Sequence, residues 1–149
     1  MTRFSLDANV LVYAADGGAG DRHARALHIL VSAARRDCVL TLQALGEFFF
    51  TATRKGIVPP RDAAEQVRDF LQIFRTFAAD VGAVRAALDW AERGRRSFWD
   101  GVLIGTLAGA GCEVLLSEDM QDGVRFGGVT VLNPFVGDEL PEAVAALLR

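Results

Sequence analysis

Residues 4–14 carry the sequence FSLDANVLVYA, in which a short apolar run ends at an acid and a second apolar run follows. The segment Arg3–Leu6 is typical of a β-strand, and Val10–Ala15 is typical of a short helix. Asp7 lies between them, where the strand ends. This order predicts the first strand–helix unit of an α/β fold, with a carboxylate where the two elements meet.

Beyond this stretch, short apolar runs alternate with longer helical patterns along the chain. We expect helices at residues 22–36, 43–55, 81–93 and 97–108. Two further helices are expected, one from Pro60 onward with Val67, Phe70, Leu71 and Phe74 as its apolar stripe, and one after Pro141. Strands are expected at residues 38–41, 76–78, 113–116 and 129–132. Residues 117–128 are expected to form turns. The alternation predicts a single α/β domain over residues 1–149, built around a mainly parallel sheet.

The composition is that of a folded globular protein, with 51% hydrophobic and 23% charged residues among 149. No apolar run approaches the roughly 20 residues of a membrane span, and no apolar leader precedes Arg3, so we expect a cytoplasmic protein without a membrane contact. Cys38 and Cys112 are expected to be reduced core thiols. The net charge of −3 excludes no class of partner. Once four candidate site acids are set aside, the chain has 16 basic and 15 acidic residues, so the rest of the chain is nearly neutral.

Four acids differ from ordinary surface acids because each lies in or beside an apolar stretch. They are Asp7 in FSLDANVLVYA, Glu47 in LQALGEFFF, Asp100 in SFWDGVLIG and Asp119 in VLLSEDMQDG. Asp7 and Asp119 follow predicted strands, and the other two lie near the starts of predicted helices. Because parallel strands end at one edge of a sheet and the following helices begin there, all four acids are predicted at that edge.

Each of these acids also has an ordinary structural role open to it. The roles are an N-cap for Asp7, a solvated helix face for Glu47, a capping box with Ser97 for Asp100, and turn positions for Asp119 and for the nearby Asp122. None of these roles requires the acids to converge. Their shared edge is therefore what favours a site.

If the acids converge, their mutual repulsion determines the chemistry. Two carboxylates about 4 Å apart repel by roughly 4 kcal/mol at an effective dielectric constant of 20, so a cluster of four needs a cation. Oxygen ligands favour Mg²⁺ or Mn²⁺ over zinc, and such ions can activate water and neutralise charge on a phosphodiester. The chain has no Walker-type loop, no GxGxxG motif and no candidate Ser–His–Asp triad. Metal-assisted phosphodiester hydrolysis is the chemistry that this pattern favours.

The segments FSLDANVLVYA, LQALGEFFF, SFWDGVLIG, VLLSEDMQDG and VTVLNPF, in this order, resemble the PIN-domain ribonucleases, particularly the VapC-type toxins of bacterial toxin–antitoxin pairs. The resemblance implies a three-layer α/β/α sandwich with metal-binding acids at Asp7, Glu47, Asp100 and Asp119 and supporting polar residues at Asn9 and Ser117. It also implies hydrolysis of RNA with Mg²⁺ or Mn²⁺, leaving 5′-phosphate and 3′-hydroxyl ends. A homodimer and a small antitoxin that occludes the site are implied as well.

Two positions depart from the family pattern. Ala8 stands where many relatives have Thr or Ser, which could cost the site a supporting hydrogen bond. Asp122 stands where His is common; it is a further candidate metal ligand, although a turn role is the explanation we prefer. Arg95 and Arg96 precede the predicted helix at residues 97–108 and are candidate RNA contacts, with a solvated helix end as the alternative.

The predicted helix that follows the second strand also carries aromatic and basic residues. For Arg54 and Lys55 we prefer a solvated helix end, where cations interact favourably with the helix dipole, to a phosphate contact. Phe48, Phe49 and Phe50 cannot all face one core. Burial between two layers is the explanation we prefer, and exposure of at least one ring at a partner surface is the alternative.

Two functions of different classes remain open. The first is a metal-dependent endoribonuclease that acts as a toxin, with RNA as substrate and an antitoxin as partner. The second is a PIN-like module that acts mainly by binding a partner protein and is catalytically weak because of Ala8. A phosphoacceptor signalling domain fits less well, since it needs paired acids after the first strand and a lysine near the last one, and the only lysine is Lys55.

Overall fold

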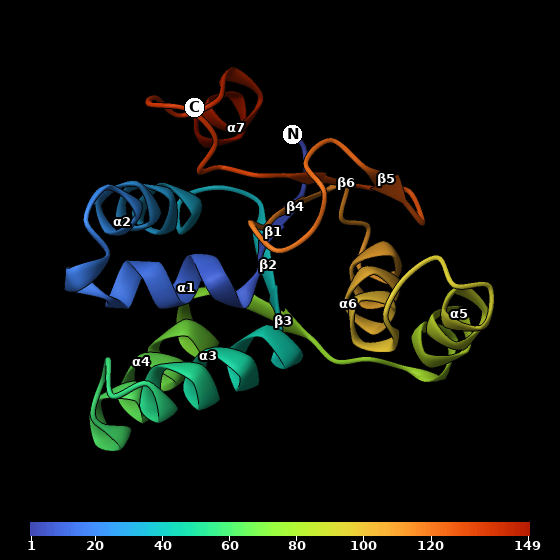
Figure 1. Ribbon diagram of the computed structural model, residues 1–149, viewed down its shortest axis with the longest axis horizontal. Helices are drawn as coiled ribbons and strands as arrows, with labels where there is room; N and C mark the ends of the chain where they lie inside the picture. Colours follow the sequence, from blue (N-terminus) through green and yellow to red (C-terminus); the bar gives the residue numbers. More distant parts are fainter.

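The computed structural model describes residues 1–149, and its central element is a six-stranded sheet (Figure 1). The strands are β1 (Phe4–Leu6), β2 (Cys38–Thr41), β3 (Arg75–Phe77), β4 (Val114–Leu116), β5 (Arg125–Phe126) and β6 (Val129–Leu132), in the spatial order β3-β2-β1-β4-β6-β5. Every neighbouring pair is parallel except β5 with β6. The predicted α/β class with a mainly parallel sheet is confirmed.

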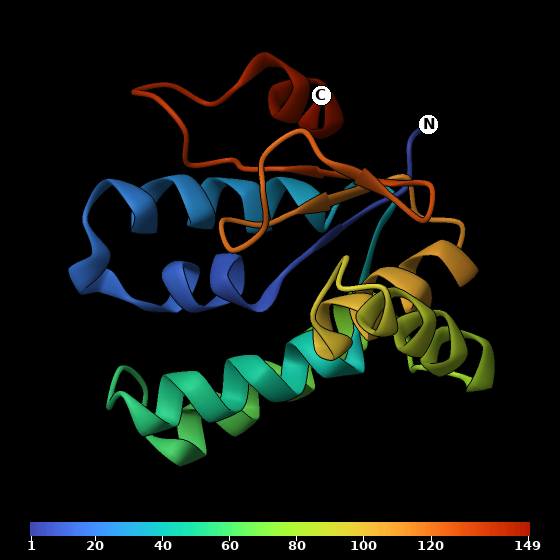
Figure 2. The same ribbon diagram turned by 45° about the vertical axis from the view of Figure 1, so that its right-hand side comes forward.

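Seven α-helices surround the sheet. They are α1 (Ala8–Ala15), α2 (Asp21–Ala33), α3 (Leu42–Arg54), α4 (Pro60–Ile73), α5 (Val81–Glu92), α6 (Phe98–Gly109) and α7 (Glu142–Leu148), with a 3₁₀ turn at Gly17–Ala19. The helices α5 and α6 pack on each other on one side of the sheet, and the others lie on the opposite side (Figures 1 and 2). No helix combines the length and the apolar character needed to cross a lipid bilayer.

Alternate side chains of the strands face two separate cores, which explains the three layers. Phe4, Leu6 and Leu40 lie in a core of 21 buried residues that includes side chains of α1 to α4 and of α7. Val39 points to the other face, into a core of 9 buried residues with Ile104 of α6. Because helices cover both faces, the four inner strands β1, β2, β4 and β6 are largely apolar, as buried parallel strands usually are.

The segment after β4 differs from the prediction, because residues 117–128 are not turns throughout. Arg125–Phe126 forms β5, which pairs antiparallel with β6. Gly127 and Gly128 connect the two strands with φ angles of 59° and 83°. A two-residue hairpin loop of this kind needs positive φ at both positions, which glycine adopts without strain.

Two helices also end earlier than their apolar patterns suggest. Helix α2 stops at Ala33 rather than at residue 36, because the next residues form tight i→i−3 turns that lead into β2. Phe74 is not part of α4: its backbone is extended and leads into β3, although its side chain is buried as predicted. Leu71, expected in the same apolar stripe, is exposed.

The direction of the crossover connections reverses between β1 and β4. The chain moves from β1 to β2 and β3 on one side, and returns through α5 and α6 to β4 on the other. A crevice forms at such a reversal, beyond the carboxyl ends of the strands. Asp7 follows β1 and Ser117 follows β4, and the Asp7 amide donates to the Leu116 carbonyl at 2.9 Å. The fold therefore places two acid-bearing segments side by side.

Candidate active site

Asp7 is the most enclosed of the candidate acids, with only 5% of its surface exposed. It is the N-cap of α1, and its Oδ1 accepts a hydrogen bond from the Ala8 amide at 2.8 Å. Its Oδ2 accepts a second bond from the Ser117 hydroxyl at 2.8 Å. The N-cap role and a role in a site are thus compatible, because each uses a different carboxylate oxygen.

Burial and neighbouring acids make the charged form of Asp7 unfavourable. Desolvation is the largest cause and raises the pKa of Asp7 to about 6, against the opposing effect of its hydrogen bonds to Ser117 and Ala8. The negative charges of Glu47 and Asp119 raise this pKa further. A carboxylate in such surroundings gains from a nearby cation, which would restore its ionised form.

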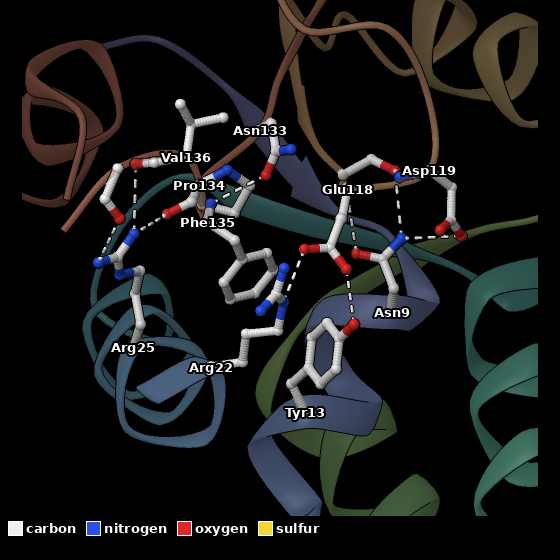
Figure 3. Close-up of polar contacts among 12 residues, drawn as sticks. Asn9, Tyr13, Arg22, Arg25, Glu118, Asp119, Asn133, Pro134, Phe135 and Val136 are labelled. Carbon is white, nitrogen blue, oxygen red and sulfur yellow. Dashed lines mark hydrogen bonds and ion pairs between the residues drawn. The ribbon is translucent and has the colours of Figure 1, made fainter. Parts of the chain in front are cut away.

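A hydrogen-bond network joins Asp7 to Asp119 through Ser117 and Asn9, and Figure 3 shows the bonds that Asn9 makes with Glu118 and Asp119. The Ser117 oxygen accepts bonds from Asn9 Nδ2 at 3.2 Å and from the Asp119 amide at 3.1 Å. Asn9 Nδ2 also donates to Asp119 Oδ2 at 3.1 Å, while Asn9 Oδ1 accepts from the Glu118 amide at 3.2 Å. The network fixes the start of α1 against the loop after β4, and it orients both aspartates.

Glu47 faces the same region from α3. It lines a groove of about 370 Å³ together with Asn9 and Asp119. Gln43, one turn earlier on α3, donates through Nε2 to Glu47 Oε1 at 3.3 Å and to the Trp99 carbonyl at 3.1 Å. This amide connects the Glu47 carboxylate to the first turn of α6.

Asp100 lies in that first turn of α6 but does not join the network. Its amide donates to Ser97 Oγ at 3.2 Å, which is one half of the predicted capping box. The reciprocal bond from the Ser97 amide to the Asp100 carboxylate is absent, and this carboxylate accepts no other hydrogen bond within the chain. All four acids thus lie at one edge of the sheet, but Asp100 reaches the others only through Gln43 and the backbone of Trp99.

The donor set fits a hard divalent cation, although the acids do not form a closed cluster. No group of three or more His, Cys, Asp or Glu side chains lies close enough to hold one ion. The candidates are nevertheless all oxygen ligands, and the pKa of Asp7 shows that its negative charge is poorly compensated. Glu47 and Asp119 are exposed, so their side chains can rotate toward Asp7.

The other residues singled out in the sequence lie outside this hydrogen-bond network. Asp122 Oδ1 accepts a hydrogen bond from the Asn133 amide at 2.8 Å, which is a turn role. Arg95 is exposed, and the Arg96 guanidinium lies 4.9 Å from the centre of the Phe126 ring. Cys38 and Cys112 are buried free thiols, as expected, and burial raises the pKa of both.

Three residues that the sequence did not single out support the site. Tyr13 Oη donates to Glu118 Oε1 at 2.6 Å, and Arg22 Nε donates to Glu118 Oε2 at 2.8 Å (Figure 3). Tyr13 lies one helical turn after Asn9 and therefore on the same face of α1. That spacing was the available signal for Tyr13; no comparable pattern points to the other two.

A family model for the PIN domain matches residues 5–122, which is most of the chain. The chain therefore belongs to the PIN domain family. The resemblance stated from the sequence is confirmed by this match, and the three-layer fold agrees with it.

The solved structures with this fold include toxin–antitoxin proteins. VapC20 from Mycobacterium tuberculosis, a toxin that cleaves the sarcin-ricin loop, aligns with a TM-score of 0.64 at 17% identity over 78% of this chain and 91% of its own. FitAcB from Neisseria gonorrhoeae aligns with a TM-score of 0.63 at 17% identity, over 89% of this chain and 99% of its own. DNA-bound VapBC from Salmonella typhimurium aligns with a TM-score of 0.61 at 18% identity, over 88% of this chain and 97% of its own. At such identities the likeness is one of fold, and no curated protein matches the chain.

Proposed function

We propose that this PIN domain is a divalent-metal-dependent endoribonuclease that acts as the toxin of a toxin–antitoxin pair. The observation that carries the proposal is the network of Asp7, Ser117, Asn9 and Asp119 at the reversal point of the sheet, with Glu47 on the facing helix. Carboxylates gathered at such a point in a PIN fold suit binding of Mg²⁺ or Mn²⁺. The toxin–antitoxin proteins among the structural neighbours support the biological role.

In this proposal each acid has a distinct task. Asp7 and Asp119 hold the cation from the end of β1 and from the loop after β4, and Glu47 and Asp100 complete the ligand set from α3 and α6. When bound, Mg²⁺ or Mn²⁺ supplies positive charge to the phosphodiester and activates water.

Ser117 and Asn9 keep the two aspartates in place, because every side-chain polar atom of Ser117 and Asn9 already has a partner within the chain. Arg95 and Arg96 are proposed to contact RNA phosphates near the start of α6. The stacking of Arg96 on Phe126 keeps its guanidinium beside the β5–β6 hairpin.

Cleavage of total RNA by the purified protein, with and without Mn²⁺ or Mg²⁺, tests the proposal. We expect fragments with 5′-phosphate and 3′-hydroxyl ends that are abolished by EDTA, by Asp7→Asn and by Asp100→Asn. Circular dichroism establishes that both variants are folded. Full cleavage by both folded variants would reject the assignment of these residues, and no cleavage under any metal condition would reject the nuclease.

The open arrangement of the acids favours a second candidate, a PIN module that binds a partner and cleaves poorly. No three of the acids lie close enough together to hold one ion, and Ala8 supplies no side-chain hydrogen bond. A small antitoxin that occludes the site and a homodimer are proposed for either candidate. Tight partner binding by a protein that never cleaves RNA would favour this second function.

A further inference from the structure

The groove beside the acids extends well past them, between α1 and α3. Glu47, Thr51 and Lys55 line it at successive turns of α3, since residues four apart share a helix face. Asn9 and Tyr13 line the opposite wall from α1 in the same way. The two helices lie side by side in both ribbon views (Figures 1 and 2). The groove therefore leads from the candidate active site to the end of α3.

The two ends of this groove have opposite charge. Glu47 and Asp119 stand at the end nearest Asp7, and Lys55 stands at the other. Eight residues separate Glu47 from Lys55 along the helix, a distance of about 12 Å at 1.5 Å per residue. Lys55 takes part in none of the ion pairs or side-chain hydrogen bonds of the chain, so its ammonium group is available to an external anion.

An aromatic ring is exposed between these two ends. Phe50 lines the groove with 60% of its surface exposed. The Arg54 guanidinium lies 5.6 Å from the centre of the Phe50 ring, within the range of a cation–π contact. An exposed ring beside an arginine, with a lysine further along the same groove, suits single-stranded nucleic acid, since the ring can stack a base and the cations attract phosphates.

We propose that the groove between α1 and α3 holds the single-stranded RNA that flanks the cleaved bond, with a base stacked on Phe50 and a phosphate at Lys55. The inference rests on the proposed nuclease function, because the acid end of the groove is where the reacting phosphodiester lies. A base can stack on Phe50 only when it is unpaired, because the neighbouring base pairs cover its faces in a duplex. The protein thus selects unpaired RNA, and Lys55 is a binding residue rather than a solvated helix end.

Fluorescence anisotropy of a labelled, unstructured 12-nucleotide RNA tests this inference. The protein carries Asp7→Asn, which keeps the probe intact, and the buffer contains Mg²⁺. The same strand annealed to its complement is the duplex probe. Phe50→Ala and Lys55→Ala are the test variants. Phe49→Ala and Arg35→Ala are the matched controls: Phe49 is exposed on the same helix outside the groove, and Arg35 lies at the amino edge of the sheet.

We expect Phe50→Ala to weaken binding of the single strand at least about fivefold, as loss of one stacked base does. Lys55→Ala should weaken it and lower the slope of log K against log salt by about 0.7, the value for one phosphate contact on a single strand. The controls should leave the affinity unchanged, and the duplex should bind more weakly than the single strand. In the cleaving protein, Phe50→Ala and Lys55→Ala should raise KM with kcat nearly unchanged.

The inference is overturned if both variants bind the single strand as the parent does, or if the duplex binds as tightly as the single strand. It is also overturned if the variants lose affinity only for a protein partner, which would make the groove a protein-docking surface. Failure of the nuclease proposal gives a different result, since the wild-type protein would then cleave no RNA while binding remains measurable.

Discussion

Ser117 serves three partners with one buried hydroxyl. It donates to Asp7 Oδ2 and accepts from Asn9 and from the Asp119 amide. Ser117→Ala leaves buried groups without partners and should lower the free energy of unfolding by about 1–3 kcal/mol, measured in urea. Ser5 is a matched control, because its hydroxyl is equally buried but has no hydrogen-bond partner. Equal losses for Ser117→Ala and Ser5→Ala would show that the network contributes nothing.

Asp7 should make the metal-free protein less stable as pH rises. Its pKa is raised from 3.8 to about 6 in the folded state, so between these values the folded protein binds more protons than the unfolded one. Stability from this group is complete below pH 4 and lost by about pH 6–7, by at most roughly 3 kcal/mol. In EDTA, the unfolding free energy of Asp7→Asn minus that of wild type should therefore grow between pH 4 and 7. A constant difference would contradict the shift.

At the scale of elements, Glu118 connects α1 and α2 to the loop that carries Asp119. Tyr13 and Arg22 each bond one of its carboxylate oxygens, and the bond to Glu118 is the largest cause of the raised pKa of Tyr13. Tyr13 is the only tyrosine, so absorbance titration reads this contact directly. Glu118→Ala should lower the pKa of Tyr13 and weaken Mn²⁺ binding by about tenfold, as loss of an outer support does at metal sites.

The control for Glu118 is Glu113→Ala, an exposed acid at the opposite edge of the sheet. It removes the same charge without touching the loop. An equal loss of Mn²⁺ affinity in both variants would show that Glu118 acts through its charge and not through its contacts.

The contact between α5 and α6 depends on two glycines. A Cβ added at Gly101 would lie 3.0 Å from Ala87 Cα, and one at Gly105 would lie 3.0 Å from Ala83 Cα. Gly101→Ala and Gly105→Ala should each destabilise the protein by about 1–3 kcal/mol in thermal or urea unfolding. Gly109→Ala, in the same helix with open space around it, should be neutral or stabilising by up to about 1 kcal/mol. Tolerance of all three substitutions would contradict this close packing.

For the whole molecule, hydrophobic patterning predicted nearly every element, because most strands are short apolar runs and most helices carry apolar residues at helical spacing. The β5 strand was not predicted, because two residues are too few to show a periodicity. The Gly127–Gly128 pair, which suits a hairpin loop, was the only sequence signal for it. The prediction that the four acids lie at one edge of the sheet required only the parallel arrangement of the strands. Whether Asp100 contacts the others depends on how α6 packs, which local sequence does not determine. The partners of Glu118 come from separate helices and were equally beyond a local pattern.

Metal binding at this edge should stabilise the entire domain, because an ion that binds only the folded state shifts the folding equilibrium toward it. At a Mn²⁺ concentration 100-fold above its dissociation constant the gain is about 2.7 kcal/mol, seen as a rise in Tm that EDTA reverses. Asp7→Asn should abolish the rise. Asp122→Asn keeps an oxygen that can accept from the Asn133 amide and should retain the rise if Asp122 serves only the turn. Loss of the rise in both variants would instead make Asp122 a ligand, and a rise retained by Asp7→Asn would place the ion elsewhere.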